Sequence, residues 1–347
     1  MTAENSLHSF GIGIATHNSV GDIIEVYYPA PLRDPDAILV EAVAAAAGYQ
    51  EGNQVLPLPA DKAAALSQQL ATTNARDHAD LLQALADSGR PLVATFLAED
   101  SAPQTVAEVY LKLHLLSHRL CEPHGINLSG AFAVLYNIAW TNEGAIDLND
   151  LPARQLQARL RGELLDVISV DKFPKMTNYV VPPGIRIADT SRVRLGAHVG
   201  EGTTVMHEGF INFNAGTRGQ AMIEGRISAG VIIGNGSDLG GGCSTMGTLS
   251  GGGTEIISVG EDCLIGANAG IGIALGDRCI VEAGLYITAG TKLRLLDQDN
   301  TVVEEIKARE LSGQSDLLFR RNSLTGAVEC KTNKTRIALN EELHTNN

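Results

Sequence analysis

The chain has 347 residues, enough for two domains with a large buried core. Its formal net charge of −14 argues against general nucleic-acid binding, which needs a basic surface to neutralise phosphates. Hydrophobic residues make up 44% of the chain and aromatic residues only 4%, a balance that favours a core of stacked aliphatic side chains.

The five cysteines are scattered and form no C-x-x-C pair, which is typical of reduced thiols in a cytoplasmic protein. The sequence begins without a basic start or an apolar run, so we expect no signal peptide. No window approaches the roughly 18 apolar residues that a membrane-spanning helix needs. These features predict a cytoplasmic protein without a membrane partner.

Residues 1–175 predict an α+β domain. Residues 8–30 have the pattern of a β-hairpin, and residues 91–96 that of a short apolar strand. A helix is expected to begin at Asp36 and to end at Gly48. Further helices are expected at residues 60–73, 76–88, 105–120 and 151–165. We find no metal or nucleotide motif in this part of the chain.

An aliphatic residue recurs at every sixth position between residues 185 and 293, and the next residue is often glycine. The four registers are Ile187, Val193, Val199, Val205 and Ile211; Ile233, Leu239 and Ile257; Val259, Ile265 and Ile271; Leu275, Val281, Ile287 and Leu293. This period is the signature of a parallel β-helix, in which each hexapeptide forms one short strand and one corner. A β-sandwich would show period-two alternation instead. We therefore predict a mainly β chain with a parallel β-helix at residues 176–295.

After residue 295 the six-residue period stops. Residues 296–347 contain strand-like segments at 301–305, 317–319, 327–330 and 335–338. Thr325 and Gly326 fit the turn of a hairpin. We therefore predict a short C-terminal β extension as the third part of the chain.

The repeat is interrupted twice, and binding groups tend to gather where a regular scaffold is interrupted. The first interruption lies between Ile211 and Ile227, whose spacing is not a multiple of six. The second, at residues 240–253, is rich in glycine, which lets a ligand approach the backbone and its N–H groups. A flexible loop is the alternative interpretation of this glycine-rich segment.

Two carboxylates, Glu208 and Glu224, lie beside the first interruption. Glu224 has the chemistry of a general base, although its spacing from Arg226 alone favours a surface ion pair between them. The repeat contains only two histidines, His198 and His207, whereas an open zinc site needs three ligands. We find no P-loop, dinucleotide-binding or serine-hydrolase motif.

Several long strings resemble those of the tetrahydrodipicolinate N-succinyltransferase family, in the longer form of actinobacteria and pseudomonads. They are MHEGFINFNAG at 206–216, EGRISAG at 224–230, MGTLSGGG at 246–253 and GANAGIG at 266–272. Shorter matches occur at residues 307–313 and 320–323. The resemblance is strong from about 175 to 330, whereas the N-terminal part matches in size and layout more than in motif.

The resemblance implies a left-handed β-helix that forms a homotrimer with active sites between subunits. It implies transfer of succinyl from succinyl-CoA to the amine of L-2-amino-6-oxopimelate, the opened form of tetrahydrodipicolinate. The products are N-succinyl-2-amino-6-oxopimelate and CoA, in diaminopimelate and lysine biosynthesis. Glu224 matches the catalytic carboxylate, acting either as a nucleophile that forms an acyl anhydride or as the base for the amine. Gly247 matches the backbone N–H that stabilises the oxyanion.

The family pattern also implies contacts with the substrate and with succinyl-CoA at Arg226, Gly241, Ser244, Ala267, Glu282, Ala283, Gly290, Lys307, Arg320, Arg321, Asn322 and Ser323. The basic members of this set suit the carboxylates of the reactants and the phosphates of CoA. Glu208 matches a position that binds Mg²⁺ at the trimer axis in some members, whereas Ser191 stands where some have a second acidic ligand.

Two other functions remain alternatives on the sequence alone. One is a hexapeptide acyltransferase that uses a different acyl-CoA, and the other is a non-catalytic β-helix that serves as an assembly scaffold.

Overall fold

The computed structural model describes residues 7–72, 76–247 and 256–332, and the chain divides into two compact units. The first comprises Met1–Leu120 with Gly125–Pro174, and the second Cys121–His124 with Lys175–Asn347. The division at 1–175, 176–295 and 296–347 stays a prediction. None of the described helices is long and apolar enough to cross a membrane.

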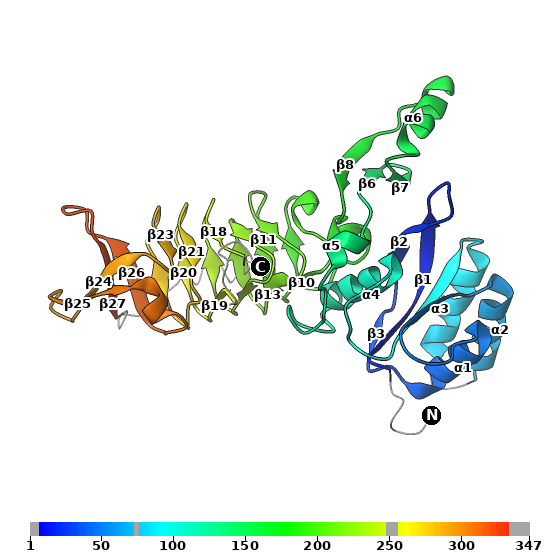
Figure 1. Ribbon diagram of the computed structural model, residues 1–347, viewed down its shortest axis with the longest axis horizontal. Helices are drawn as coiled ribbons and strands as arrows, with labels where there is room; N and C mark the ends of the chain where they lie inside the picture. The colour runs from blue at the N-terminus through cyan, green and yellow to red at the C-terminus, as the bar shows by residue number, and fades with distance from the viewer. Residues whose placement is uncertain (1–6, 73–75, 248–255, 333–347) are drawn as a thin grey trace. The chain divides into compact units, whose positions relative to one another are not determined.

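The first unit contains an antiparallel sheet in the order β2-β1-β5-β4, with β3 also paired to β1 (Figure 1). Its strands are β1 (Ser9–His17), β2 (Ile23–Tyr27), β3 (Leu32–Arg33), β4 (Gln54–Pro57) and β5 (Leu92–Leu97). Three helices share a buried core with this sheet: α1 (Ala37–Ala47), α2 (Ala60–Leu70) and α3 (Arg76–Asp87). The predicted hairpin is confirmed, and α1 begins after Asp36 and ends at Gly48 as expected.

Helix α4 (Val106–Ser117) is buried on every side, which explains its almost continuous run of apolar residues. Thr105 caps its first turn together with Glu108 in a reciprocal capping box. The fully buried Lys112 ammonium lies 2.7 Å from the Asp100 carboxylate and donates to two backbone carbonyls, so its charge is compensated.

The first unit also contains a three-stranded sheet in the order β7-β6-β8, which was not predicted from the sequence. It consists of β6 (Ile138–Thr141), β7 (Gly144–Asp147) and β8 (Val167–Asp171). The short helix α5 (Ala131–Val134) precedes it, and α6 (Leu151–Leu160) connects β7 to β8. Ile168 and Val170 of β8 are more than half exposed, so this strand lacks the buried face that makes a strand recognisable in a sequence.

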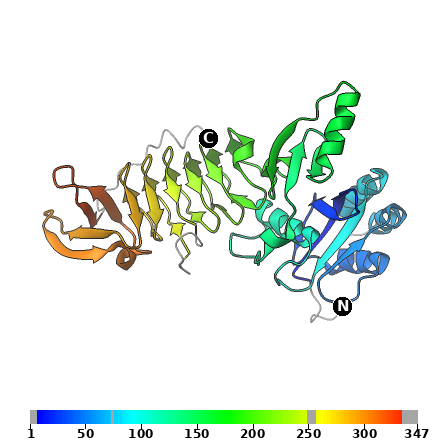
Figure 2. The ribbon, with the colours of Figure 1, turned by 45° about the horizontal axis from the view of Figure 1, so that its top comes forward.

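The second unit is a parallel β-helix whose short strands stack in three sheets (Figure 2). One sheet consists of β10 (Ala197–Val199), β13 (Ala215–Thr217), β16 (Ile232–Ile233) and β19 (Ser258–Val259). Another, called the β12 face below, consists of β12 (Phe210–Ile211), β15 (Arg226–Ile227), β18 (Ser244–Thr245), β21 (Gly270–Gly272) and β23 (Tyr286–Thr288). The third begins with β9 (Arg186–Ile187), β11 (Thr203–Val205), β14 (Ala221–Ile223), β17 (Asp238–Leu239), β20 (Leu264–Ile265) and β22 (Ile280–Val281).

The aliphatic registers read from the sequence form the core of this coil. Four of these side chains are 0% exposed and belong to one buried cluster: Val205, Ile223, Ile265 and Ile271. Ile223 pairs with Leu239, sixteen positions on, whereas Val205 pairs with Ile223, eighteen positions on. Coils of unequal length explain why the six-residue period in the sequence changes register.

The C-terminal strands extend the third sheet of the β-helix, because β26 (Leu317–Arg321) pairs in parallel with β22. The other strands are β24 (Lys292–Leu296), β25 (Val302–Lys307) and β27 (Val328–Thr332). Strands β26 and β27 form an antiparallel hairpin, which confirms the turn at Thr325 and Gly326. The strand expected at 335–338 lies outside the described residues.

Candidate active site

Most of the expected site residues lie along one corner of the β-helix, called the Glu224 corner. Glu224 follows β14, Gly240 follows β17 and Gly266 follows β20. Their N–H groups donate in turn to Leu239 O (2.9 Å), Ile265 O (2.8 Å) and Val281 O (2.8 Å), which stacks the three positions in successive coils. The same corner carries Glu208, Gly241, Ala267, Glu282, Ala283, Arg320, Arg321 and Asn322.

Glu224 is partly buried, and its carboxylate lies against glycine backbone. A Cβ atom built on Gly241 would be 3.4 Å from Glu224 Oε2, so this carboxylate oxygen lies beside the Gly241 backbone. The spacing argument for an ion pair with Arg226 is wrong, because the described residues include no ion pair of Glu224 or of Arg226. Arg226 instead points along the β12 face.

Among the residues described, the thiol near Glu224 is that of Cys243, and it is unsuited to nucleophilic attack. Burial, and then the charge of Glu224, raise the pKa of Cys243 to about 12. Cys243 is 2% exposed and therefore stays protonated at neutral pH. Glu224 is thus the group at this position of the corner that can accept a proton or attack an acyl carbon.

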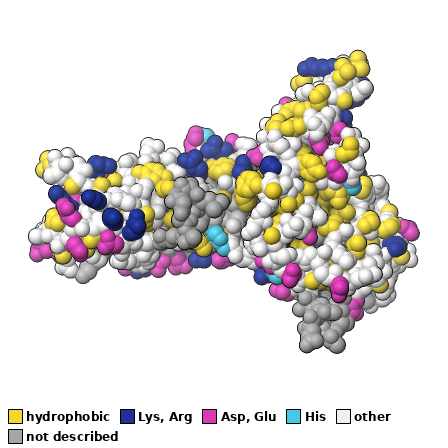
Figure 3. Space-filling model, in the orientation of Figure 1, with side chains coloured by type: hydrophobic (Ala, Val, Ile, Leu, Met, Phe, Trp, Pro, Cys, Tyr) yellow, Lys and Arg dark blue, Asp and Glu magenta, His cyan; other side chains and the backbone are white. Residues whose placement is uncertain are grey.

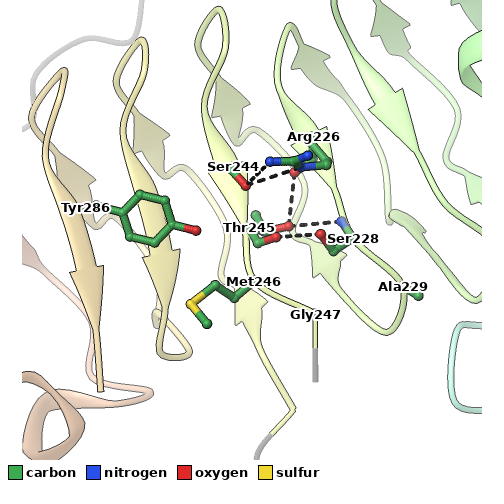
Figure 4. Close-up of a pocket in the computed structure, with 8 residues that line it drawn as sticks. All are labelled: Arg226, Ser228, Ala229, Ser244, Thr245, Met246, Gly247 and Tyr286. Carbon is green, nitrogen blue, oxygen red and sulfur yellow. Dashed lines mark hydrogen bonds between the residues drawn. The ribbon is translucent and has the colours of Figure 1, made fainter. Parts of the chain in front are cut away.

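A pocket of about 570 Å³ lies on the β12 face (Figure 4). It is lined by Arg226, Ser228, Ala229, Ser244, Thr245, Met246, Gly247 and Tyr286. Arg226 donates from Nη2 and Nε to Ser244 Oγ, at 3.0 and 3.3 Å. These two bonds hold the guanidinium over the pocket, where its positive charge can bind a carboxylate. The pocket therefore brings together three residues expected from the sequence, namely Arg226, Ser244 and Gly247.

Glu224 and Gly247 lie at opposite edges of the β12 face, since Glu224 precedes the strands of this face and Gly247 follows them. A Cβ built on it would be 3.2 Å from Ala229 O, just beyond β15, whereas Glu224 comes just before β15. The remainder of the glycine-rich interruption, residues 248–253, lies outside the described part of the chain.

Lys and Arg side chains gather over the C-terminal strands (Figure 3). Arg320 Nη2 lies 2.9 Å from a carboxylate oxygen of Glu329, and Asn322 Nδ2 donates to the other oxygen at 2.8 Å. Burial raises the pKa of Glu329, but these bonds outweigh it and hold that pKa below its usual value. Arg320 and Asn322 are therefore fixed by the buried Glu329.

The remaining expected contacts are separate from the pocket. Arg321 N donates to Glu282 Oε2 at 2.6 Å, which ties the β26–β27 hairpin to the Glu224 corner. Lys307 ends β25 opposite Lys292, and Ser323 lies in the hairpin turn. No neighbouring atom lies within 4 Å of a Cβ built on Gly290.

The structure of one chain does not assemble the predicted magnesium site. Within the described ranges, no three His, Cys, Asp or Glu side chains cluster so as to hold a metal ion. The Glu208 side chain is 65% exposed and lies 3.0 Å from His207 Nε2. Ser191 Oγ donates to Asp189 at 2.6 Å, a local turn contact.

Comparison with known proteins places the whole chain in one family. Family models described as "Tetrahydrodipicolinate N-succinyltransferase N-terminal" and "middle" match residues 68–133 and 135–175. A model described as "Hexapeptide repeat of succinyl-transferase" matches residues 256–289. These matches include the N-terminal unit, whose sequence resembles the family in size and layout more than in motif.

Curated relatives named 2,3,4,5-tetrahydropyridine-2,6-dicarboxylate N-succinyltransferase align over almost the whole chain. The protein of Pseudomonas paraeruginosa is 66% identical and that of Vibrio cholerae 61%, over 99% and 98% of this chain and 99% of each relative. A crystal structure from Campylobacter jejuni, titled as a 2,3,4,5-tetrahydropyridine-2-carboxylate N-succinyltransferase, is 34% identical. It superposes with a TM-score of 0.87 and covers 96% of this chain and 94% of its own. The chain therefore belongs to the tetrahydrodipicolinate N-succinyltransferase family and is an acyltransferase enzyme.

Proposed function

We propose that Glu224 is the catalytic carboxylate for succinyl transfer from succinyl-CoA to the amine of L-2-amino-6-oxopimelate. The reaction gives N-succinyl-2-amino-6-oxopimelate and CoA and belongs to diaminopimelate and lysine biosynthesis. The observation that carries this role is the partly buried Glu224 carboxylate, which lies against Gly241 without an ion pair among the described residues. Such a carboxylate is available to the reactants rather than neutralised by a protein cation.

Two chemical routes fit this carboxylate. As a base, Glu224 takes a proton from the ammonium, the amine attacks the thioester carbon, and the C–S bond breaks to release the CoA thiolate. As a nucleophile, Glu224 attacks the thioester first, and the amine then cleaves the resulting anhydride. In both routes the carbonyl oxygen becomes an oxyanion, for which Gly247 N–H is the proposed donor.

The two proposed catalytic positions support a site that is shared between subunits. Glu224 lies just before β15, whereas Gly247 lies beside Ala229, just after β15, so the strand separates the two positions. One tetrahedral centre needs both groups within hydrogen-bond reach, about 3 Å. A homotrimer of left-handed coils, as in the family pattern, supplies Glu224 and Gly247 from neighbouring copies.

The expected ligand contacts follow the same arrangement. Along the Glu224 corner, Gly241, Ala267 and Ala283 are small enough for a long thioester to pass. Basic side chains lie beyond them, at Lys307 and Arg321, and suit the phosphates of CoA. The full proposed set is Arg226, Gly241, Ser244, Ala267, Glu282, Ala283, Gly290, Lys307, Arg320, Arg321, Asn322 and Ser323.

Two further properties are proposed from the family pattern. Three symmetry-related copies of the exposed Glu208 carboxylate would repel one another, so a Mg²⁺ ion at the trimer axis would offset their charge. Five free, buried cysteines support a reducing, cytoplasmic location.

The test is a thiol-release assay with succinyl-CoA and tetrahydrodipicolinate, on the wild type and on Glu224→Gln. We expect Glu224→Gln to lower kcat by about 10²- to 10⁴-fold, the usual contribution of a general acid or base. Glu261→Gln, an exposed carboxylate elsewhere on the β-helix, serves as the matched control and should retain activity. If Glu224→Gln kept wild-type turnover with an intact trimer, the proposed role would be wrong. Faster transfer from acetyl-CoA than from succinyl-CoA would instead favour the alternative acyltransferase.

A further inference from the structure

The outward-facing residues of the β12 face form a column with large side chains at its ends and small ones in its middle. Phe210 pairs with Arg226, Arg226 with Ser244, Ser244 with Gly270, and Gly270 with Tyr286. Successive strands are about 4.8 Å apart, so the backbone positions of Arg226 and Tyr286 are about 14 Å apart. Ser244 therefore lies on the floor of a hollow between two long side chains, Arg226 and Tyr286.

Strand β21 lies beneath the Tyr286 and Met246 side chains, and its two outward residues are glycine. A Cβ on Gly270 would lie 2.2 Å from Tyr286 Cε2, so the tyrosine ring covers this position. A Cβ on Gly272 would lie 2.6 Å from Met246 Sδ, so the methionine covers the other. Real Cβ atoms do not approach neighbours this closely, and any larger residue at either position would displace one of the two side chains.

The two ends of the hollow differ in chemistry. At one end the Arg226 guanidinium is held by Ser244 and, among the described residues, has no carboxylate partner. At the other end the Met246 thioether and the Tyr286 ring present apolar surface, with the Tyr286 hydroxyl toward the strand of Ser244 (Figure 4). A cation beside an apolar wall matches a short aliphatic chain that ends in a carboxylate.

We propose that Tyr286 and Met246 are specificity-determining residues, which select a straight aliphatic chain whose carboxylate binds Arg226 and whose methylenes lie over Ser244, against the Tyr286 and Met246 side chains. This inference rests on the proposed function, because both of its reactants have this chemistry. The succinyl group is a two-methylene chain ending in a carboxylate, and the acceptor is an aliphatic dicarboxylate. The same hollow serves one of these two chains, and kinetics can distinguish them.

The experiment uses the full-length protein with Tyr286→Ala and Met246→Ala, and with Val303→Ala as an exposed control in the same unit. The donor arm compares succinyl-CoA with glutaryl-CoA, which has one more methylene, and with butyryl-CoA, in which a methyl group replaces the carboxylate. The acceptor arm compares L-2-aminopimelate with L-2-aminoadipate, one methylene shorter, and with L-2-aminoheptanoate, which lacks the distal carboxylate. Thermal unfolding and size-exclusion chromatography show whether each variant keeps its fold and assembly.

We expect the wild type to discriminate at least tenfold in kcat/KM along one arm, since one methylene in a fitted pocket contributes about 10- to 200-fold. Both variants should lose most of that discrimination along the same arm, chiefly through KM, whereas Val303→Ala should keep it. Loss along the donor arm assigns the hollow to the succinyl chain, and loss along the acceptor arm assigns it to the amine substrate. Unchanged discrimination in both arms overturns the proposal.

A milder variant tests the wall without opening it. Tyr286→Phe keeps the ring over Gly270 and should retain the length discrimination of the wild type, because the apolar ring is the selecting feature. If Tyr286→Phe lost that discrimination as Tyr286→Ala does, the hydroxyl would be responsible and the apolar-wall proposal would be wrong. A wild type inactive with every donor would refute the proposed function itself, an outcome separate from altered selectivity.

Discussion

Thr245 is a polar residue in the aliphatic core, and its replacement by valine should destabilise the β-helix. It occupies the inward position between Ile227 and Ile271, and it is 1% exposed. Its hydroxyl accepts from Ser228 N at 3.1 Å and donates to Arg226 O at 3.1 Å. In the preceding coil, the equivalent N–H, that of Asn212, donates to the backbone carbonyl of Ile227. The Thr245 hydroxyl therefore takes the place of a backbone acceptor for the Ser228 N–H.

The magnitude follows from these contacts. Valine has the same shape but no hydroxyl, and would leave the Ser228 N–H without its partner, at about 1–3 kcal/mol when buried. It would also lose the hydroxyl bond to Arg226 O, at about 1 kcal/mol, although the strand pairing of Arg226 with Ser244 leaves that carbonyl a ladder bond. The added methyl in an apolar stack offsets about 1 kcal/mol. Because Ser228 is only partly buried, we expect a net loss of about 1–3 kcal/mol in the free energy of unfolding of Thr245→Val.

The assay is guanidinium chloride unfolding at one fixed protein concentration, since association shifts apparent stability. Thr245→Ser keeps both hydrogen bonds and loses only a methyl, so it should be destabilised by about 1 kcal/mol. Ile271→Val, one coil further in the same column, sets the scale for losing a methyl without any change of hydrogen bonding. A Thr245→Val protein as stable as the wild type, or more stable, would refute the reasoning.

Two predictions concern the N-terminal unit. Lys112→Met should cost about 3–5 kcal/mol in denaturant unfolding, because it leaves Asp100 and two carbonyls without their cation, whereas exposed Lys62→Met should stay within about 0.5 kcal/mol. Burial lowers the pKa of His114 to about 3, below its ordinary value of 6.5, so the unfolded chain binds this proton first as the pH falls. Stability from neutral His114 is therefore complete above about pH 6.5 and declines toward pH 3 by up to about 1.4 kcal/mol per pH unit. Unfolding midpoints at pH 7 and pH 5 should show this decline, and His114→Gln should reduce it; equal slopes in both proteins would contradict the assignment.

The sequence predicted the features that short-range chemistry determines. The cap at Asp36, the stop at Gly48 and the inward aliphatic residues each depend on neighbours in the chain or on a simple period. The ion pair between Glu224 and Arg226 was wrong because a coil corner separates them, and Arg226 turns along the β12 face toward Ser244. Two residues of spacing say nothing about which side of a corner each side chain faces.

The hollow under Tyr286 could not be read from the chain, because it depends on register between coils of unequal length. Ser244 and Gly270 are 26 positions apart and in register, whereas Gly270 and Tyr286 are only sixteen apart. The longer step contains the glycine-rich interruption. A fixed period would therefore pair the wrong residues, and only the structure shows that Gly270 lies under the Tyr286 ring.

The β-helix explains why one corner can serve a long donor and a small acceptor together. From Glu224 through Gly240, Gly266 and Glu282 to Arg320, four coil steps of about 4.8 Å give a track of about 19 Å. Gly240 and Gly266 are small, so in the proposed arrangement an extended thioester lies along the corner with its reactive carbon at Glu224 and its phosphates toward the cationic hairpin. The proposal puts the acyl carbon where the corner meets the β12 face, the face that also carries Arg226. If the proposed roles hold, the number of stacked coils sets the distance between the phosphates of succinyl-CoA and the carboxylate that acts on its acyl group.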